Sequence, residues 1–176
     1  MLPERYAWLA RETGPRMIVE ALKLFGTLEA AGSRNNPTIV AWAKEVGGEV
    51  ADLYKADSIP WCGLFLAVVA KRAGKVFPQH PLWALSWSAF GSKVTAAGLG
   101  DVLVFTRKGG GHVGLYVGED AGAFHVLGGN QSDRVCITRV ARSRLYAARR
   151  PLYRVQPDNV RPLHLEASGA LSLNEA

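Results

Sequence analysis

The chain of 176 residues is long enough for one domain with a sizeable hydrophobic core, and 48% of its residues are hydrophobic. No apolar run approaches the roughly 18 residues that a membrane-spanning helix needs, so we expect no membrane span. The net charge of +6 indicates an anionic partner such as nucleic acid, a membrane or a cell-wall polymer. Residues 1–14 lack the apolar stretch of a secretory signal, which predicts synthesis into the cytoplasm.

The first half of the sequence has the pattern of helices. Apolar side chains recur at i, i+3, i+4 and i+7 spacing, and Pro or Asn precedes and Gly follows several of these stretches. We therefore predict helices over residues 15–26, 35–48, 60–74 and 81–91.

The second half changes character after residue 100. Short segments rich in β-branched and aromatic residues are separated by Gly, Asp and Ser, which favours an antiparallel meander or a small barrel. The order of helices and then strands indicates an α+β fold. We expect one domain over 1–155, with a helical part over 1–56 and a core over 57–155, followed by a tail over 156–176. The predicted strands are 101–105, 112–118, 123–129, 134–140 and 144–150.

Cys62 lies in "PWCGLF", in the first turn of the predicted helix over 60–74. Unpaired backbone N–H groups and the helix dipole favour a thiolate at this position, lowering its pKa. The same N–H groups could hold a developing oxyanion, and Gly63 leaves space beside the sulfur for a substrate backbone. These features make Cys62 a candidate nucleophile, although a free cysteine is more often a small core residue.

A thiolate nucleophile needs a base, and histidine suits neutral pH. Of the four histidines, His112 starts a strand directly after three glycines, which places it at a sheet rim. We therefore predict His112 as the base. His80 in a Pro-flanked loop and His164 in the tail have weaker contexts.

Hairpin register decides which residue orients the imidazole of His112. If the turn centres on Ala121, His112 pairs with Asn130, whereas a tight turn at residues 118–119 would place His112 opposite His125. The Asp and Gly of "EDAG" favour the longer turn. Asn130 is therefore the preferred third residue, and His125 stays open as the alternative.

Other sites are less well supported by the sequence. Cys136 lies in the alternating pattern of the strand "RVCITRV", which favours a role in packing. The sequence contains no CxxC, HExxH, P-loop or dinucleotide-binding motif. We expect no metal and no cofactor. The seven arginines of 133–154 fit a solvated strand face or an anion-binding patch equally well.

The motifs "PWCGLF", "GDVLVF…GGGHVGLYVGED" and "VLGGNQS" resemble the papain-like NlpC-type and CHAP families of peptidoglycan hydrolases, within about residues 57–150. They are most similar to a CHAP-like subgroup of phage and prophage proteins. The resemblance implies a papain-like fold, with Cys62 as nucleophile, His112 as base and Asn130 as orienting residue. NlpC-type enzymes often use a histidine as the third residue, which would point to His125.

The resemblance also implies amide cleavage in peptidoglycan by an amidase or endopeptidase, as in an endolysin or a tail-associated lysin. A basic surface would help adhesion to anionic cell-wall polymers. Because no signal is visible, we expect action in the periplasm or cell wall after release through a holin or as a virion component, with phage tail proteins as further partners. The alternative is a non-catalytic, structural or binding tail component on the same fold. Nucleic acid is suggested by charge alone, and we expect none to be bound.

Overall fold

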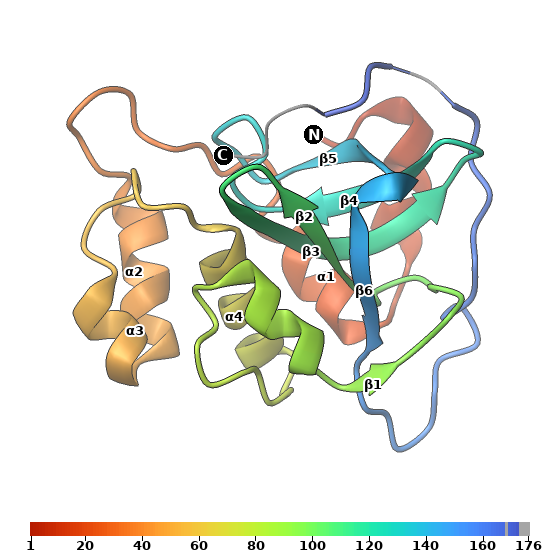
Figure 1. The fold of residues 1–176 in the computed structure, drawn as a ribbon, viewed down its shortest axis with the longest axis horizontal. Coiled ribbons are helices and arrows are strands. Elements are labelled where there is room, and N and C mark those ends of the chain that lie inside the picture. Colours follow the sequence, from red (N-terminus) through yellow and green to blue (C-terminus); the bar gives the residue numbers. More distant parts are fainter. Residues whose placement is uncertain (168, 173–176) are drawn as a thin grey trace.

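Six antiparallel strands form one open sheet in the order β1-β6-β2-β3-β4-β5. The computed structural model describes residues 1–167 and 169–172. Strands β2 to β5 follow one another as a meander, and β6 crosses back to pair with β2 (Figure 1). The strands are β1 (Ser92–Lys93), β2 (Val102–Arg107), β3 (Gly110–Glu119), β4 (Ala123–Gly128), β5 (Cys136–Ala141) and β6 (Leu145–Arg150).

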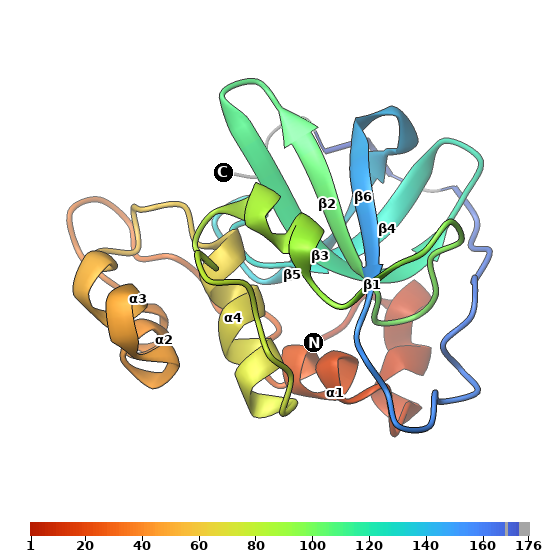
Figure 2. The same ribbon diagram turned by 60° about the horizontal axis from the view of Figure 1, so that its bottom comes forward.

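The helices gather on one side of this sheet. Figure 2 shows α1 and α4 against the sheet, with α2 and α3 on the far side of α4. The α-helices are α1 (Arg16–Leu22), α2 (Pro37–Val46), α3 (Gly48–Leu53) and α4 (Cys62–Arg72). The 3-10 helices are η1 (Glu4–Arg11), η2 (Ala84–Ala89) and η3 (Arg142–Arg144).

Local signals explain where α2 and α4 begin and end. The side chain of Asn36 accepts a hydrogen bond from the backbone N–H of Thr38, Pro37 opens α2, and Gly47 follows it with φ of 81°. In α4, the first nine residues, 62–70, are all buried. This burial follows from the position of α4, which packs between α1 and α2 and against β3.

Two buried clusters cover the two faces of the sheet. The larger cluster joins the helices to the inner face, which includes Val113 and Leu115 of β3. The smaller cluster lies on the other face and includes Phe105, Tyr116 and Phe124. Both faces are therefore buried, and this explains the nearly continuous apolar character of β2, β3 and β4.

The structure confirms the α+β class and corrects details of the prediction. The sheet is open, so the small-barrel alternative is wrong, and the segment predicted as a helix over 81–91 contains the 3-10 helix η2 instead. The sequence analysis missed η1 and α3. In the tail predicted over 156–176, residue 168 and residues 173–176 lie outside the described residues, and His164 forms a parallel bridge to Glu119 of β3.

Several arginines of 133–154 bind within the protein. Arg150 forms an ion pair with buried Asp101 at 2.8 Å. Arg139 pairs with Asp120, also at 2.8 Å. Arg149 donates to the carbonyl of Phe90. Much of this basic segment therefore stabilises the sheet and its flanking loops.

Candidate active site

Cys62 is the first residue of α4, as the sequence predicted. Trp61 precedes the helix as its N-cap and is itself fully buried, and its ring Nε1 donates to Glu29 at 2.9 Å. Trp61 also packs against Trp42, with ring centroids 6.0 Å apart. These contacts hold the start of α4, so Cys62 is rigidly placed and only 4% exposed.

The Cys62 sulfur faces backbone donors. The N–H groups of Val113, Gly63 and Cys62 itself are directed at it, and Arg107 adds a favourable charge. Burial nevertheless dominates and raises the pKa of the Cys62 thiol. The expected lowering of this pKa is therefore wrong for the closed structure, because the site is desolvated more strongly than its donors compensate.

Val113 directly follows His112 in β3. His112 is fully buried, and its ring stacks on Phe105 with centroids 6.5 Å apart. The structure therefore brings together Cys62 and the neighbourhood of His112, which lie 50 residues apart in sequence.

Gln131 holds the imidazole of His112. Its Oε1 lies 3.0 Å from His112 Nε2. Its amide nitrogen donates to the carbonyls of Val126, at 3.1 Å, and Cys136, at 2.6 Å, which fixes the orientation of the amide. Because Oε1 is an acceptor, His112 carries its proton on Nε2, and Nδ1 is the basic nitrogen.

Asn130 was expected in the position that Gln131 occupies. The strand pairs Leu115–Leu127 and Tyr116–Val126 follow the predicted register, the one in which residue 112 faces residue 130. The chain leaves β4 after Gly128, however, and Asn130 adopts a left-handed conformation with φ of 56°. The partner of Nε2 is thus one residue further along, while Oδ1 of Asn130 is buried without a hydrogen-bond partner.

Two glycines make room for this arrangement. A Cβ on Gly128 would lie 2.9 Å from Oε1 of Gln131, and one on Gly129 would lie 2.5 Å from Cβ of Phe65 in α4. The two glycines before "NQ" therefore indicate a position where neighbouring side chains approach the backbone too closely for a Cβ atom.

His125, the alternative third residue, lies in a different cluster. A bulge at Val117 places His125 opposite Gly118 rather than Val117. Its Nε2 contacts Asp120 at 2.9 Å, and its Nδ1 contacts the Tyr6 hydroxyl at 2.6 Å. Both ring nitrogens are thus bound by other side chains, so His125 does not orient His112.

The segment after His80 covers the start of α4. A Cβ on Gly63 would lie 2.2 Å from the carbonyl oxygen of Pro81, and one on Gly111 would lie 2.7 Å from Leu85. The space beside the sulfur that we expected for substrate is therefore filled by the protein's own backbone. Gly63 is required for this close approach.

The chain matches no protein-family model and has no significant match among curated proteins. Within the described residues, no helix combines the length and apolar character needed to cross a bilayer. In the same part of the chain, no group of three or more His, Cys, Asp and Glu side chains is arranged to hold a metal ion.

Proposed function

We propose that this protein is a papain-like cysteine hydrolase that cleaves an amide bond through Cys62 and His112, with Gln131 as the positioning residue. One observation carries the proposal: Cys62 is the first residue of α4, the backbone of Val113 acts to lower the pKa of its thiol, and the preceding residue, His112, has its Nε2 3.0 Å from an amide oxygen. A nucleophile, a base of defined tautomer and an orienting group are the parts that acyl transfer requires.

The resting thiol is neutral, because burial raises its pKa. Nδ1 of His112 therefore takes the proton from Cys62 as the sulfur attacks the carbonyl carbon. The backbone N–H groups around Cys62 are placed to stabilise the oxyanion. Collapse of the tetrahedral intermediate breaks the C–N bond, and His112 returns the proton to the departing amine. Water then attacks the thioester, gives a proton to Nδ1 and releases the acid and the thiol.

A groove lined in part by the segment that covers Gly63 offers a place for the substrate. A cavity of about 200 Å³ is lined by α3 and by residues 80–83, the segment that also touches Gly63. Trp83 stands at its edge with 73% of its surface exposed, and His80 lies 3.6 Å from Glu49. An exposed tryptophan beside polar groups is suited to bind an amphipathic substrate, so we propose that the substrate binds here.

Peptidoglycan is the substrate we propose, at an amide of the stem peptide or at its link to muramic acid. The support is the resemblance of the Cys62 and His112 motifs to NlpC-type and CHAP hydrolases, together with the net charge of +6, which favours adhesion to an anionic wall. As part of the same proposal, the enzyme reaches the wall through a holin or on a virion.

Burial favours one competing function. Cys62 is 4% exposed and His112 is fully buried, so part of the chain must move before a substrate can reach the sulfur. A non-catalytic tail component would keep this region closed. The two functions differ in whether Cys62 reacts in the native protein.

The test compares the wild-type protein with Cys62→Ala and with Cys136→Ser, its control at the other free cysteine, which keeps a donor for the carbonyl of Gln131. We expect wild type and Cys136→Ser to clear purified peptidoglycan, Cys62→Ala to leave it turbid, and mass spectrometry of the fragments to identify the bond. Equal clearing by all three would remove Cys62 from the mechanism. No clearing of several wall types, with Cys62 inert to iodoacetamide, would establish the non-catalytic function.

A further inference from the structure

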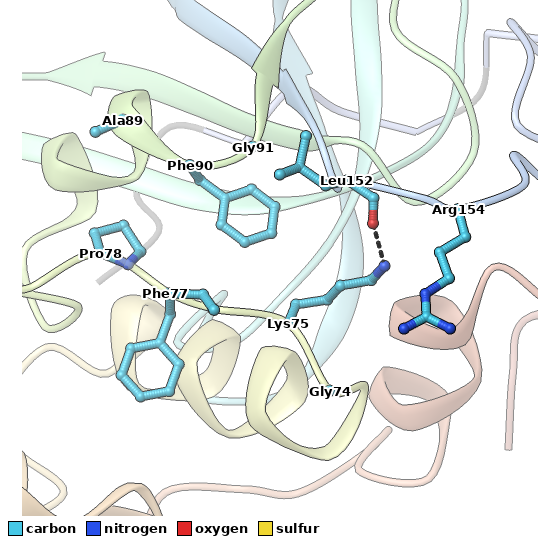
Figure 3. Close-up of a pocket in the computed structure, with 10 residues that line it drawn as sticks. Gly74, Lys75, Phe77, Pro78, Ala89, Phe90, Gly91, Leu152 and Arg154 are labelled. Carbon is cyan, nitrogen blue, oxygen red and sulfur yellow. Dashed lines mark hydrogen bonds between the residues drawn. The ribbon is translucent and has the colours of Figure 1, made fainter.

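A second, larger cavity lies at the opposite end of α4 from Cys62. Its volume is about 660 Å³, within the range of small-molecule sites. It is formed by the segment that follows α4, the end of η2 and the segment that follows β6 (Figure 3). An α-helix of 11 residues spans about 16 Å, so this cavity is separate from the candidate active site.

The lining of the cavity combines an apolar wall with two cations. Figure 3 shows Phe77, Pro78, Phe90 and Leu152 around the hollow, with the Lys75 side chain extended across it. Arg154 lines the same cavity beyond Lys75. Apolar groups on one side and cations on the other suit a ligand that is itself divided into an apolar part and an anionic part.

Lys75 has no counter-ion in the part of the chain that the structure describes. Its Nζ donates to the carbonyl of Leu152 and lies 4.5 Å from the centroid of the Tyr153 ring. Among the described residues no carboxylate pairs with it, and burial lowers its pKa with no nearby negative charge to oppose the shift. A partly buried ammonium group in this situation gains from an anion brought by a ligand.

Arg154 differs from the arginines of its segment that pair with carboxylates. Arg139 and Arg150 are both tied to carboxylates, whereas the described residues give Arg154 no ion pair. The aliphatic residues nearby are also left in water, with Val76 91% exposed and Leu152 69% exposed. The rim of the cavity therefore combines an arginine that has no carboxylate partner among the described residues with apolar side chains that are exposed to solvent.

We propose that this cavity binds an anionic amphiphile, with a carboxylate or phosphate head between Lys75 and Arg154 and an alkyl chain along Phe77, Phe90 and Leu152. The anionic head alone should bind weakly, because the cations are exposed to solvent on one side. The alkyl chain alone should also bind weakly, because the cavity is open. The proposal does not depend on the hydrolase function.

The experiment is calorimetric titration of the full chain with dodecanoate and with dodecyl phosphate, both below their micelle concentrations. Acetate and inorganic phosphate test the head alone, and dodecyl maltoside tests the chain with a neutral head. We expect at least one anionic amphiphile to bind with 1:1 stoichiometry, and the three controls to bind at least about tenfold more weakly. The preferred head distinguishes a fatty-acid ligand from a lipid phosphate.

Variants locate the binding. Lys75→Met combined with Arg154→Gln should weaken binding at least about tenfold, while Lys44→Met in α2 removes a charge elsewhere and should not. Ala89→Trp fills the cavity from its exposed rim without changing charge and should also abolish binding. Failure of both amphiphiles to bind, equal binding of dodecyl maltoside, or unchanged binding by the double variant and by Ala89→Trp would overturn the proposal.

Discussion

Two fully buried histidines on neighbouring strands have different surroundings. His125 in β4 is enclosed by the Tyr6 hydroxyl and by Asp120, a carboxylate that Arg139 holds ionised by lowering its pKa. His112 in β3 is held at Nε2 by the neutral amide of Gln131 and directly precedes Val113, whose backbone acts on the Cys62 thiol. The first arrangement ties η1 to the sheet, and the second is suited to transfer a proton.

The difference lies in the charge of the groups that hold the two rings. At His125 the neutral ring with its proton on Nε2 donates to Asp120 and accepts from Tyr6, so both nitrogens are used within the protein. At His112 the neutral amide fixes the tautomer without adding a charge that would tie up the ring. A buried histidine thus becomes a candidate base through its partners rather than through its burial.

The largest expected effect separates the two histidines by activity. His112→Gln removes the base and should lower kcat/KM for peptidoglycan cleavage by at least about 10³-fold. His125→Gln keeps a polar group in the other cluster and should leave kcat/KM of the folded protein within about threefold. Fragment release measured at equal folded concentration checks both. A similar loss in the two variants would contradict the distinction.

Gln131 provides the next test. Gln131→Ala frees the His112 ring and should lower kcat by about 10- to 100-fold with little change in KM, because the base is misplaced while the substrate groove is intact. The acid limb of the pH–kcat/KM profile should move as well. Asn130→Gly keeps the left-handed backbone and is the matched control, expected to stay within threefold. A loss in Asn130→Gly alone would restore Asn130 as the orienting residue.

Much of the fold could be predicted because it depends on local signals. Asn36, Pro37 and Gly47 delimit α2, and the alternation of short β-rich segments with Gly and Asp located β2 to β6. The openness of the sheet could not be predicted, because the edge strand β1 is only two residues long and pairs with β6, more than 50 residues away. The helix α3 was hidden because it begins at a glycine.

The site residues near the start of a helix or strand were predicted from the sequence. The residue that follows the end of a strand, where the chain changes direction, was missed. Cys62 at the start of α4 and His112 near the start of β3 follow from the sequence pattern. Gln131 escaped because regular pairing ends at Gly128 and the positive φ of Asn130 redirects the chain. The pKa of Cys62 was misjudged because burial of the thiol outweighs the effect of its backbone donors, and sequence spacing does not reveal this burial.

The His125 cluster should matter for stability. Tyr6→Phe removes one hydroxyl and leaves Nδ1 of His125 buried without its donor, so we expect unfolding to become easier by about 1–2 kcal/mol. Urea denaturation followed by circular dichroism measures this. Tyr146→Phe, at an exposed tyrosine of β6, is the control and should change stability by less than about 0.5 kcal/mol. Equal effects would show that the Tyr6–His125 bond contributes little.

The smallest expected effect is a dependence of stability on pH. Burial lowers the pKa of His125 below its ordinary value of 6.5, and Arg139 and Arg5 act in the same direction while Asp120 opposes them. The unfolded chain therefore binds a proton more readily than the folded one, so this contribution is complete above about pH 6.5 and is lost as pH falls toward the folded pKa. Between pH 7 and 5 the free energy of unfolding should fall further in wild type than in His125→Gln. Parallel pH profiles for the two proteins would mean that Asp120 stabilises the protonated ring as well as burial destabilises it, and the contrast between the two histidines would then rest on geometry alone.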